Sequence, residues 1–345
     1  MLGERRAAIL RLIIEYYIKT GEPIGSKTLC NLLPYAVSSA TIRNEMAHLS
    51  NLGYLEQRHT SGGRVPGKNA YRFYVDHLME PKALSPYETA KINERLSVNA
   101  GDAQRLLADT ADLLAEVTHC AAFSCALADD RDVIQGVQLI PAGGGRAMLV
   151  MLTAGGRIKS SICRLSCPAD DGFMAAFYDV MHSTFIGTPL SDVSIATMQS
   201  TAVSLGSRIF DMLPVLSTLC ALCAETRQDS LLFAGETNLL SHEELGNDVY
   251  KLLTFLTNRP RFLTLAKQFA DASAGNALFI GDENPYFELK DTATMLCSLH
   301  YNNQQRAVLG LIGSTRMDYA AIVPRAQYIM TKATDLLSEG GITNG

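Results

Sequence analysis

The sequence lacks the apolar runs that membrane and exported proteins carry. It has no uninterrupted stretch of 18 apolar residues, so we expect no membrane span. The start, MLGERRAAILRLI, places basic residues before apolar ones as a signal peptide does. However, Arg11, Glu15 and Lys19 interrupt the apolar stretch and no small-residue cleavage site follows. We therefore expect no signal peptide and a cytoplasmic protein.

The sequence also lacks the residue patterns of a catalytic, metal or cofactor site. Its eight cysteines are scattered, which is typical of reduced cytoplasmic thiols and not of a disulfide framework. Cys220 and Cys223 form a lone CxxC in an apolar stretch, which favours a core position over metal or redox chemistry. The glycine-rich run 142–146 lacks the GK[ST] ending of a phosphate loop and is interpreted as a hairpin turn. The seven histidines form no HExxH, and we expect neither an enzyme nor a resident cofactor or metal.

Charge of either sign is unevenly distributed in this chain, whose formal net charge is -5. Residues 1–72 contain ten Lys or Arg and five Asp or Glu, whereas the remaining 273 residues contain 20 basic and 30 acidic side chains. A basic head on an acidic body favours contact with a polyanion, although chance unevenness is the alternative. The acidic stretch GDENPYFELKD (281–291) has no identifiable paired counterpart, so we expect a solvated loop, with partner binding as the alternative.

Hydrophobic periodicity predicts three helices and a small hairpin in the first 70 residues or so. The first helix carries apolar residues at helical spacing and ends near Gly21. Ser26 is interpreted as the N-cap of a short helix through Leu33, and Ser38 or Ser39 as the cap of a third helix that runs to about Asn51. Short strands follow at 54–58 and near 64–65, around a double-glycine turn. This order is typical of a winged helix-turn-helix.

The rest of the chain alternates between β-prone and helical segments. Ser85–Glu88 and Ser241–Glu244 have the form of a capping box and are each expected to open a helix. From about residue 119, short β-prone runs separated by glycine turns predict an antiparallel sheet. Residues 170–230 return to helix, and strands and a closing helix follow. We expect an α+β domain interrupted by a mostly helical insertion.

The third helix has the composition of a DNA-recognition helix. Ile42, Met46 and Leu49 mark its buried side, so Ala40, Asn44 and Ala47 point outward with Thr41 and Arg43 on the flanks. Arginine bonds guanine and asparagine bonds adenine in a major groove, and small neighbours allow close approach. Hydroxyl side chains at the helix start suit phosphate contacts.

The hairpin supplies a second candidate DNA contact, along a phosphate backbone or in a minor groove. A surface hairpin with a few charges is the alternative. The DNA-binding residues predicted for both elements are Ser26, Lys27, Thr28, Ser38, Ser39, Ala40, Thr41, Arg43, Asn44, Arg58, His59, Thr60, Ser61, Gly62, Gly63 and Arg64.

Four stretches of the sequence resemble the HrcA family of heat-inducible transcription repressors. They are GEPIGSKTL (21–29), SSATIRNEMAHLSNLGYLEQRHTSGGRVP (38–66), GETNLL (235–240) and LGLIGSTRMDY (309–319). The chain departs from the family pattern at Gly63, where the family usually has Ala, and at Gly67 and Ser314, where it usually has Thr and Pro.

The resemblance implies a dimeric repressor that binds an inverted-repeat operator, CIRCE, on double-stranded DNA upstream of chaperone operons. It also implies that the GroEL chaperonin keeps the repressor active and that heat stress releases it. The implied organisation is a winged-helix domain (1–75), a helical connector (76–100) and a GAF-like domain (101–190 and 271–345) interrupted by a dimerisation domain (191–270).

Two readings of the control mechanism stay open at this point. In the first, no ligand is needed, because a marginally stable body loosened by heat loses its dimer geometry and releases DNA. In the second, a small ligand in the GAF-like domain controls the winged helix. A pocket with convergent polar groups would favour the second reading, and a filled apolar interior would favour the first.

Overall fold

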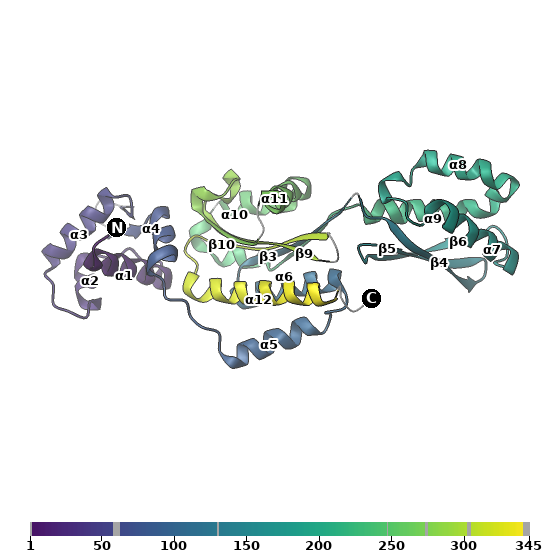
Figure 1. Ribbon diagram of the computed structural model, residues 1–345. Helices are drawn as coiled ribbons and strands as arrows, with labels where there is room; N and C mark the ends of the chain where they lie inside the picture. Colours follow the sequence, from purple (N-terminus) through teal and green to yellow (C-terminus); the bar gives the residue numbers. More distant parts are fainter. Residues whose placement is uncertain are drawn as a thin grey trace.

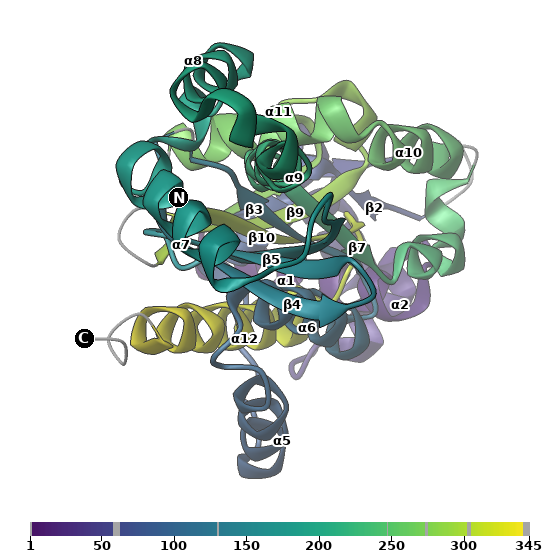
Figure 2. The same cartoon turned by 90° about the vertical axis from the view of Figure 1, so that its right-hand side faces the viewer.

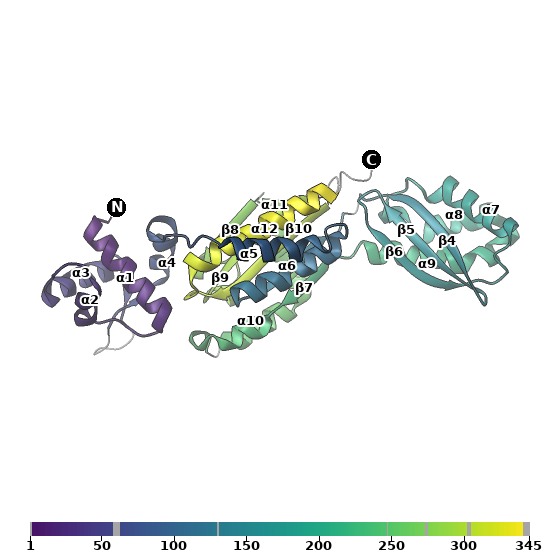
Figure 3. The same ribbon diagram turned by 90° about the horizontal axis from the view of Figure 1, so that it is seen from below.

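The computed structural model has three parts arranged end to end, which we name the head, the body and the lobe (Figure 1). It describes residues 2–57, 63–129, 131–246, 248–272, 275–301 and 305–340. The view from below shows the same order, with the body between the two outer parts (Figure 3). Helices and strands are mixed throughout, so the expected α+β class is confirmed.

The head is a small helical unit with a two-stranded antiparallel sheet. Its elements are α1 (Glu4–Thr20), α2 (Ser26–Leu32), α3 (Ser39–Asn51), β1 (Leu55–Glu56), β2 (Val65–Pro66) and α4 (Lys68–Phe73), which continues as a π-helical turn (Tyr74–Leu78). Helix α1 ends because Gly21 adopts φ +74° and its N–H donates to the Tyr17 carbonyl. Of the two predicted caps of α3, Ser38 is the one observed, since its Oγ accepts from the Thr41 N–H at 3.1 Å.

The body is built on a five-stranded antiparallel sheet of order β7-β3-β10-β9-β8. Its strands are β3 (Ala121–Leu127), β7 (Ser230–Ala234), β8 (Gly275–Ile280), β9 (Thr292–Tyr301) and β10 (Gln305–Ser314). On one face lie α6 (Ala103–Thr118) and α12 (Tyr319–Gly340), with α5 (Pro86–Ser97) outside them (Figure 3). On the other face lie α10 (Asp248–Thr257) and α11 (Arg259–Ala272) (Figure 1).

The lobe has a sheet of its own, of order β4-β5-β6, with helices on one face. Its elements are β4 (Ile134–Gly143), β5 (Arg146–Thr153), β6 (Ile158–Arg164), α7 (Asp171–Val180), α8 (Ile195–Leu205) and α9 (Ile209–Thr226). The end-on view shows α8 standing outside α9 at the edge of the lobe (Figure 2). The glycine-rich run 142–146 forms the β4–β5 hairpin, as expected.

The boundaries of the lobe differ from those expected for the insertion. The chain leaves the body sheet after β3 and re-enters it at β7, so the lobe spans residues 132–228 and not 191–270. Helices α10 and α11 belong to the body. The β-prone runs of the lobe resemble those of the body in composition, and composition does not reveal which strands share a sheet.

Three further expectations about local structure are wrong. Ser26 does not cap α2, because the cap position is Gly25 and the Ser26 hydroxyl lies 2.9 Å from that of Ser39. Ser241–Glu244 does not open an α-helix. A short 3-10 turn spans Glu243–Leu245, the Glu244 carboxylate is engaged by Arg316, and α10 begins only at Asp248. The stretch 281–291 is not a free solvated loop, because three of its carboxylates pair with the head and Glu288 pairs with Arg261 of the body. The capping box of Ser85 and Glu88 is present.

Each part of the molecule has buried apolar residues, and the apolar core of the head continues into the body. The lobe has a separate core, to which α9 contributes Met212, Leu216 and Leu219. Among the described residues, α9 is also the one helix that is long and apolar enough to cross a membrane. Core helices of globular proteins pass the same test, so this is weak support for a membrane span.

Candidate nucleic-acid interface

Helix α3 presents one face to the core of the head and leaves the other exposed. Ile42 and Leu49 are fully buried, and Met46 is nearly so. Arg43, Asn44 and Ala47 are exposed, as is Ala40 near the helix start. Figure 1 places α3 at the end of the molecule away from the body and lobe. The exposed face is therefore open to a large partner.

The acidic residue on the buried side of α3 anchors the helix to α1. Glu45 is 6% exposed, and its carboxylate accepts from Arg6 Nε at 2.7 Å and from the Arg5 guanidinium, including Nε at 3.1 Å. The bonds from Arg6 and Arg5 lower the pKa of Glu45. These contacts bring together residues about 40 positions apart. The sequence alone did not predict this role of Glu45. The usable signal is a carboxylate on the apolar side of a helix, because a buried charge needs a partner of opposite charge.

Hydroxyl groups connect the starts of α2 and α3. Ser26 Oγ and Ser39 Oγ are 2.9 Å apart, so the first residues of the two helices are joined. Ser38 Oγ lies 2.9 Å from Thr41 Oγ1 in addition to capping the helix. Lys27 and Thr28 are exposed beside this junction. The predicted contacts of α2 and α3 therefore meet at one place on the head.

The base of the hairpin is attached to the segment before α2. Ile24 and Arg64 exchange backbone hydrogen bonds of 3.0 and 2.9 Å. Gly63 packs so closely that an added Cβ would lie 2.5 Å from the Ile24 carbonyl carbon and oxygen. The Arg64 guanidinium donates to the Gln57 side chain. The predicted contacts Arg58, His59, Thr60, Ser61 and Gly62 lie outside the described residues.

The body sheet has an aromatic layer between it and α10 and α11. The Phe262 ring lies 4.7 Å from Phe123 and 4.9 Å from Phe233, centroid to centroid, and Phe255 follows at 5.7 Å. Gly310 lies against Phe123, where an added Cβ would approach within 2.4 Å of the ring. This face of the sheet is filled by apolar side chains.

A polar cavity of about 280 Å³ lies where the body meets the lobe. Its charged lining residues are mostly engaged in the fold. Arg157 donates to the Thr226 and Leu127 carbonyls at 2.6 and 2.8 Å, and Lys159 pairs with Glu225 at 2.9 Å. Of these bonds, only the one from Arg157 to Leu127 connects the lobe to the body, since Lys159 and Glu225 both belong to the lobe.

Comparisons with known proteins agree with a regulator of gene expression. The family described as HrcA protein C terminal domain matches residues 104–323. The heat-inducible transcription repressor HrcA of Acetivibrio thermocellus is 28% identical over 334 residues, covering 96% of this chain and 95% of that protein. The similarity therefore extends beyond the matched family domain and includes the head.

Solved structures also show a similar fold. A crystal structure of a hypothetical protein at 2.2 Å resolution superposes with a TM-score of 0.70 and 22% identity, covering 99% of this chain and 100% of that chain. An IclR family transcriptional regulator from Brucella abortus is 11% identical, with a TM-score of 0.21 over 95% of this chain and 91% of that chain. That score is too low to carry an argument about fold or function.

Proposed function

Because the chain belongs to the HrcA family, we propose that it is a transcription repressor of heat-shock chaperone genes. It binds an inverted-repeat operator of the CIRCE type as a dimer and leaves it under heat stress. The observation that carries the proposal is the exposed face of α3. On it, Arg43 and Asn44 lie between the small residues Ala40 and Ala47, and Ser38 caps the start of the helix. The name of the Acetivibrio thermocellus relative supports the same role.

In this proposal the head is a winged helix-turn-helix that places α3 in the major groove. Arg43 donates two hydrogen bonds to a guanine, and Asn44 bonds an adenine. The side chains at the helix starts bind phosphates and fix the register of the head on the duplex. They are Ser26, Lys27, Thr28, Ser38, Ser39 and Thr41. Ala40 allows the close approach.

The hairpin is proposed as the wing. Arg64 stands at its base, next to the segment that leads into α2. Together with Arg58, His59, Thr60, Ser61, Gly62 and Gly63, it forms the second contact with the DNA backbone or minor groove. A backbone contact of this kind adds affinity that depends on salt and carries little sequence information.

The lobe is proposed as the dimerisation domain and the body as a GAF-like domain. Four large apolar side chains of α8 and α9 are exposed, namely Ile195 (79%), Val203 (85%), Phe210 (75%) and Leu213 (51%). Large apolar side chains that are exposed close together in the sequence suit a protein interface, and we name these four the apolar patch. A second copy of the chain is the proposed occupant, because two heads related by a two-fold axis fit an inverted repeat.

The GroEL chaperonin is proposed as the partner that maintains the active repressor. This part of the proposal rests on family membership. An unpaired lobe exposes the apolar patch described above, which a chaperonin that binds apolar surface would recognise. Occupation of the chaperonin by unfolded protein during heat stress would then lower the amount of active repressor.

A regulator controlled by a small ligand is the second candidate. The polar cavity where the body meets the lobe is the place to consider for it, but Arg157, Lys159 and Glu225 of its lining already bond groups of the fold. The face of the body sheet beneath α10 and α11 is filled by the aromatic layer around Phe262. A ligand there would have to displace well-packed rings, which costs several kcal/mol. The filled apolar interior supports the first reading, in which heat acts without a ligand.

The proposal is tested by measuring binding to a duplex with the inverted repeat and to a scrambled duplex across a salt series. The variant is Arg43→Ala, and Arg105→Ala is the control, since Arg105 is an exposed arginine of the body. We expect a strong preference for the repeat in the wild type and the control, and its loss in Arg43→Ala. Equal and steeply salt-dependent binding of both duplexes by the wild type would overturn the proposal.

A further inference from the structure

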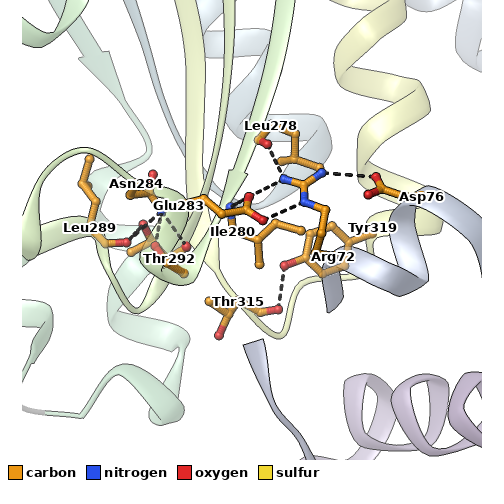
Figure 4. Close-up of polar contacts among 11 residues, drawn as sticks. Arg72, Asp76, Leu278, Ile280, Glu283, Asn284, Leu289, Thr292, Thr315 and Tyr319 are labelled. Atoms are coloured by element: carbon orange, nitrogen blue, oxygen red, sulfur yellow. Dashed lines mark hydrogen bonds and ion pairs between the residues drawn. The ribbon is translucent and has the colours of Figure 1, made fainter. Parts of the chain in front are cut away.

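The head and the body are joined by a cluster of charged contacts centred on Arg72 of α4 (Figure 4). The Arg72 guanidinium donates to both carboxylate oxygens of Glu283, one at 2.8 Å through Nε, and to the Leu278 carbonyl at 2.5 Å. It also reaches Asp76 at 3.3 Å within its own helix. A bidentate arginine–carboxylate pair fixes direction as well as distance. Arg72 therefore sets the orientation of α4 relative to the edge of the body sheet.

A second cation of α4 holds the same acidic segment. Lys68 Nζ lies 2.8 Å from Asp282 and 3.4 Å from Asp291. The Lys68 side chain also packs over Gly281, where an added Cβ would lie 2.7 Å from Lys68 Cδ. Two cations on successive turns of one helix thus face three carboxylates of the body.

The third contact runs in the opposite direction, from a cation of the body to the head. Arg316 donates to the Tyr17 and Ile18 carbonyls at 3.3 and 3.2 Å, at the carboxyl end of α1. A guanidinium is favourable there because the last carbonyls of a helix carry partial negative charge. Glu244 fixes Arg316 from the other side at 3.1 Å. The head is therefore held at two separate points, α4 and the end of α1.

The acidic segment is itself held rigid before it meets the head. The Asn284 amide donates to the Gly281 and Leu289 carbonyls, both at 3.0 Å, and the Ile280 N–H donates to Glu283 at 2.8 Å (Figure 4). Beneath the charged contacts, Tyr71 of the head lies 5.8 Å from Tyr319 of the body, and both are buried. A prearranged charged surface over an apolar contact defines one angle between the two parts.

We propose that this junction, formed by Lys68, Arg72 and Arg316 with their partners, fixes the angle of the head and thereby selects the operator half-site spacing that a dimer can bind. The inference rests on the proposed dimeric, operator-binding function. Its geometric basis is that the body separates the head from the lobe (Figure 1). If the lobes form the dimer contact, the distance between the two α3 helices depends on every rigid joint between lobe and head.

The affinity of a dimer with rigidly held heads should depend strongly on the number of base pairs between the two half-sites. Consecutive base pairs are about 3.4 Å apart along the duplex axis and rotated by roughly 35°, because one turn holds about 10 base pairs. A dimer with fixed heads can therefore occupy one spacing well and its neighbours poorly. A dimer with swivelling heads would accept several spacings with similar affinity.

The experiment measures binding to duplexes in which two CIRCE half-sites are separated by the natural spacer or by spacers changed by one to five base pairs, and to a duplex with one half-site. The variants are Arg72→Gln, Glu283→Gln and the double variant. The matched control is Arg261→Gln with Glu288→Gln, which removes a bidentate pair, with bonds of 2.6 and 3.2 Å, inside the body. Thermal unfolding verifies that each variant folds.

We expect the wild type and the control to prefer one spacing by about tenfold or more, and the junction variants to bind neighbouring spacings within about threefold of each other. Affinity for one half-site should stay within about twofold of the wild type, because the substitutions remove charged contacts at the junction and leave the buried residues Ile42, Met46 and Leu49 that support α3 unchanged. The double variant should match Arg72→Gln, since Arg72→Gln already removes the pair with Glu283 as well as the bonds to Leu278 and Asp76.

Two results would overturn the inference. The first is an unchanged spacing profile in folded Arg72→Gln and Glu283→Gln. The second is a loss of half-site affinity in Arg72→Gln alone, which would make Arg72 a phosphate contact. Failure of the proposed function is a separate outcome, recognised when the wild type prefers no half-site duplex over a scrambled one.

Discussion

Three consecutive residues of α3 lie on two different sides of the helix. Arg43 and Asn44 are exposed on the outward face, whereas Glu45 turns inward and binds Arg5 and Arg6 of α1. The Glu45 carboxylate pairs with two of the ten cations of the head. It thereby attaches α3, which carries Arg43 and Asn44, to α1. The residues proposed for DNA recognition and the residue that supports the helix are thus neighbours in the sequence, as the turn of about 100° per helical residue allows.

Glu45→Gln should lower the free energy of unfolding at neutral pH by about 1–3 kcal/mol, because it weakens charge-assisted bonds to a buried acceptor. The pKa of Glu45 is lowered in the folded protein by Arg6 and Arg5. Its stabilisation is therefore present above the ordinary carboxyl pKa and is lost as the pH falls through the folded value. We expect the difference between the variant and the wild type to shrink below about pH 4. Urea unfolding across pH measures this, with exposed Glu22→Gln as control. A constant difference at all pH values would contradict the assignment.

Gly63→Ala should strain the base of the hairpin even though the family usually has Ala at this position. The added Cβ would lie 2.5 Å from the Ile24 backbone, so the hairpin must shift. We expect a destabilisation of about 1–3 kcal/mol and weaker DNA binding. Thermal unfolding and duplex titration measure the two effects. Gly101→Ala is the control, since nothing lies within 4 Å of its added Cβ. Unchanged stability and affinity would mean that the backbone near Ile24 adapts without cost.

At the scale of elements, the lobe combines a well-packed core with an exposed apolar surface. Helix α9 buries Val215, Leu216 and Leu219 completely, whereas Phe210 and Leu213 near its start are 75% and 51% exposed. One helix thus contributes both to the core of the lobe and to the surface proposed as the dimer contact. Its apolar composition satisfies both requirements.

Replacing both Phe210 and Leu213 by Asp should convert the proposed dimer to a monomer, because two charges would be buried in the proposed apolar contact. We expect the half-site affinity of each head to be retained and the affinity for the inverted repeat to fall by about 100-fold or more. Analytical ultracentrifugation and duplex titration provide the readouts. Tyr250→Asp is the control, since Tyr250 is a 78% exposed aromatic residue of the body. A dimer that survives the double substitution would move the contact to another surface.

At the scale of the whole molecule, features that depend on neighbouring residues could be predicted from the sequence, and features that depend on distant segments could not. The cap of α3 by Ser38, the capping box at Ser85 and the buried stripe of α3 depend on residues within one or two turns, so local patterns predicted them. The lobe boundary and the pairing of Arg72 with Glu283, 211 positions apart, depend on which distant segments meet. No local pattern carries that information. The candidate DNA-binding site contains features of both kinds. Its exposed residues were selected from local patterns, whereas the contacts of Glu45 with α1 and of Ile24 with the hairpin depend on distant segments and were not predicted.

Heating should release DNA at the temperature at which the dimer or the fold is lost, if release needs no ligand. In the proposed dimer, the charged junction and the lobe contact both weaken on heating, and loss of either would change the distance between the two heads. DNA binding, dimer content and circular dichroism should be followed over the same temperature range. Release well below any change in dimer content or fold would contradict this mechanism.

The most direct test of the central claim is a titration of wild type and Arg43→Ala with the inverted repeat and with duplexes that carry symmetric single-base changes in both half-sites. If Arg43 contacts a guanine, one position should discriminate strongly in the wild type and lose about 1–3 kcal/mol of discrimination in the variant. The other positions should keep theirs. A uniform loss of affinity at every position would mean that Arg43 contacts phosphate, and the assignment of α3 as the base-reading helix would be contradicted.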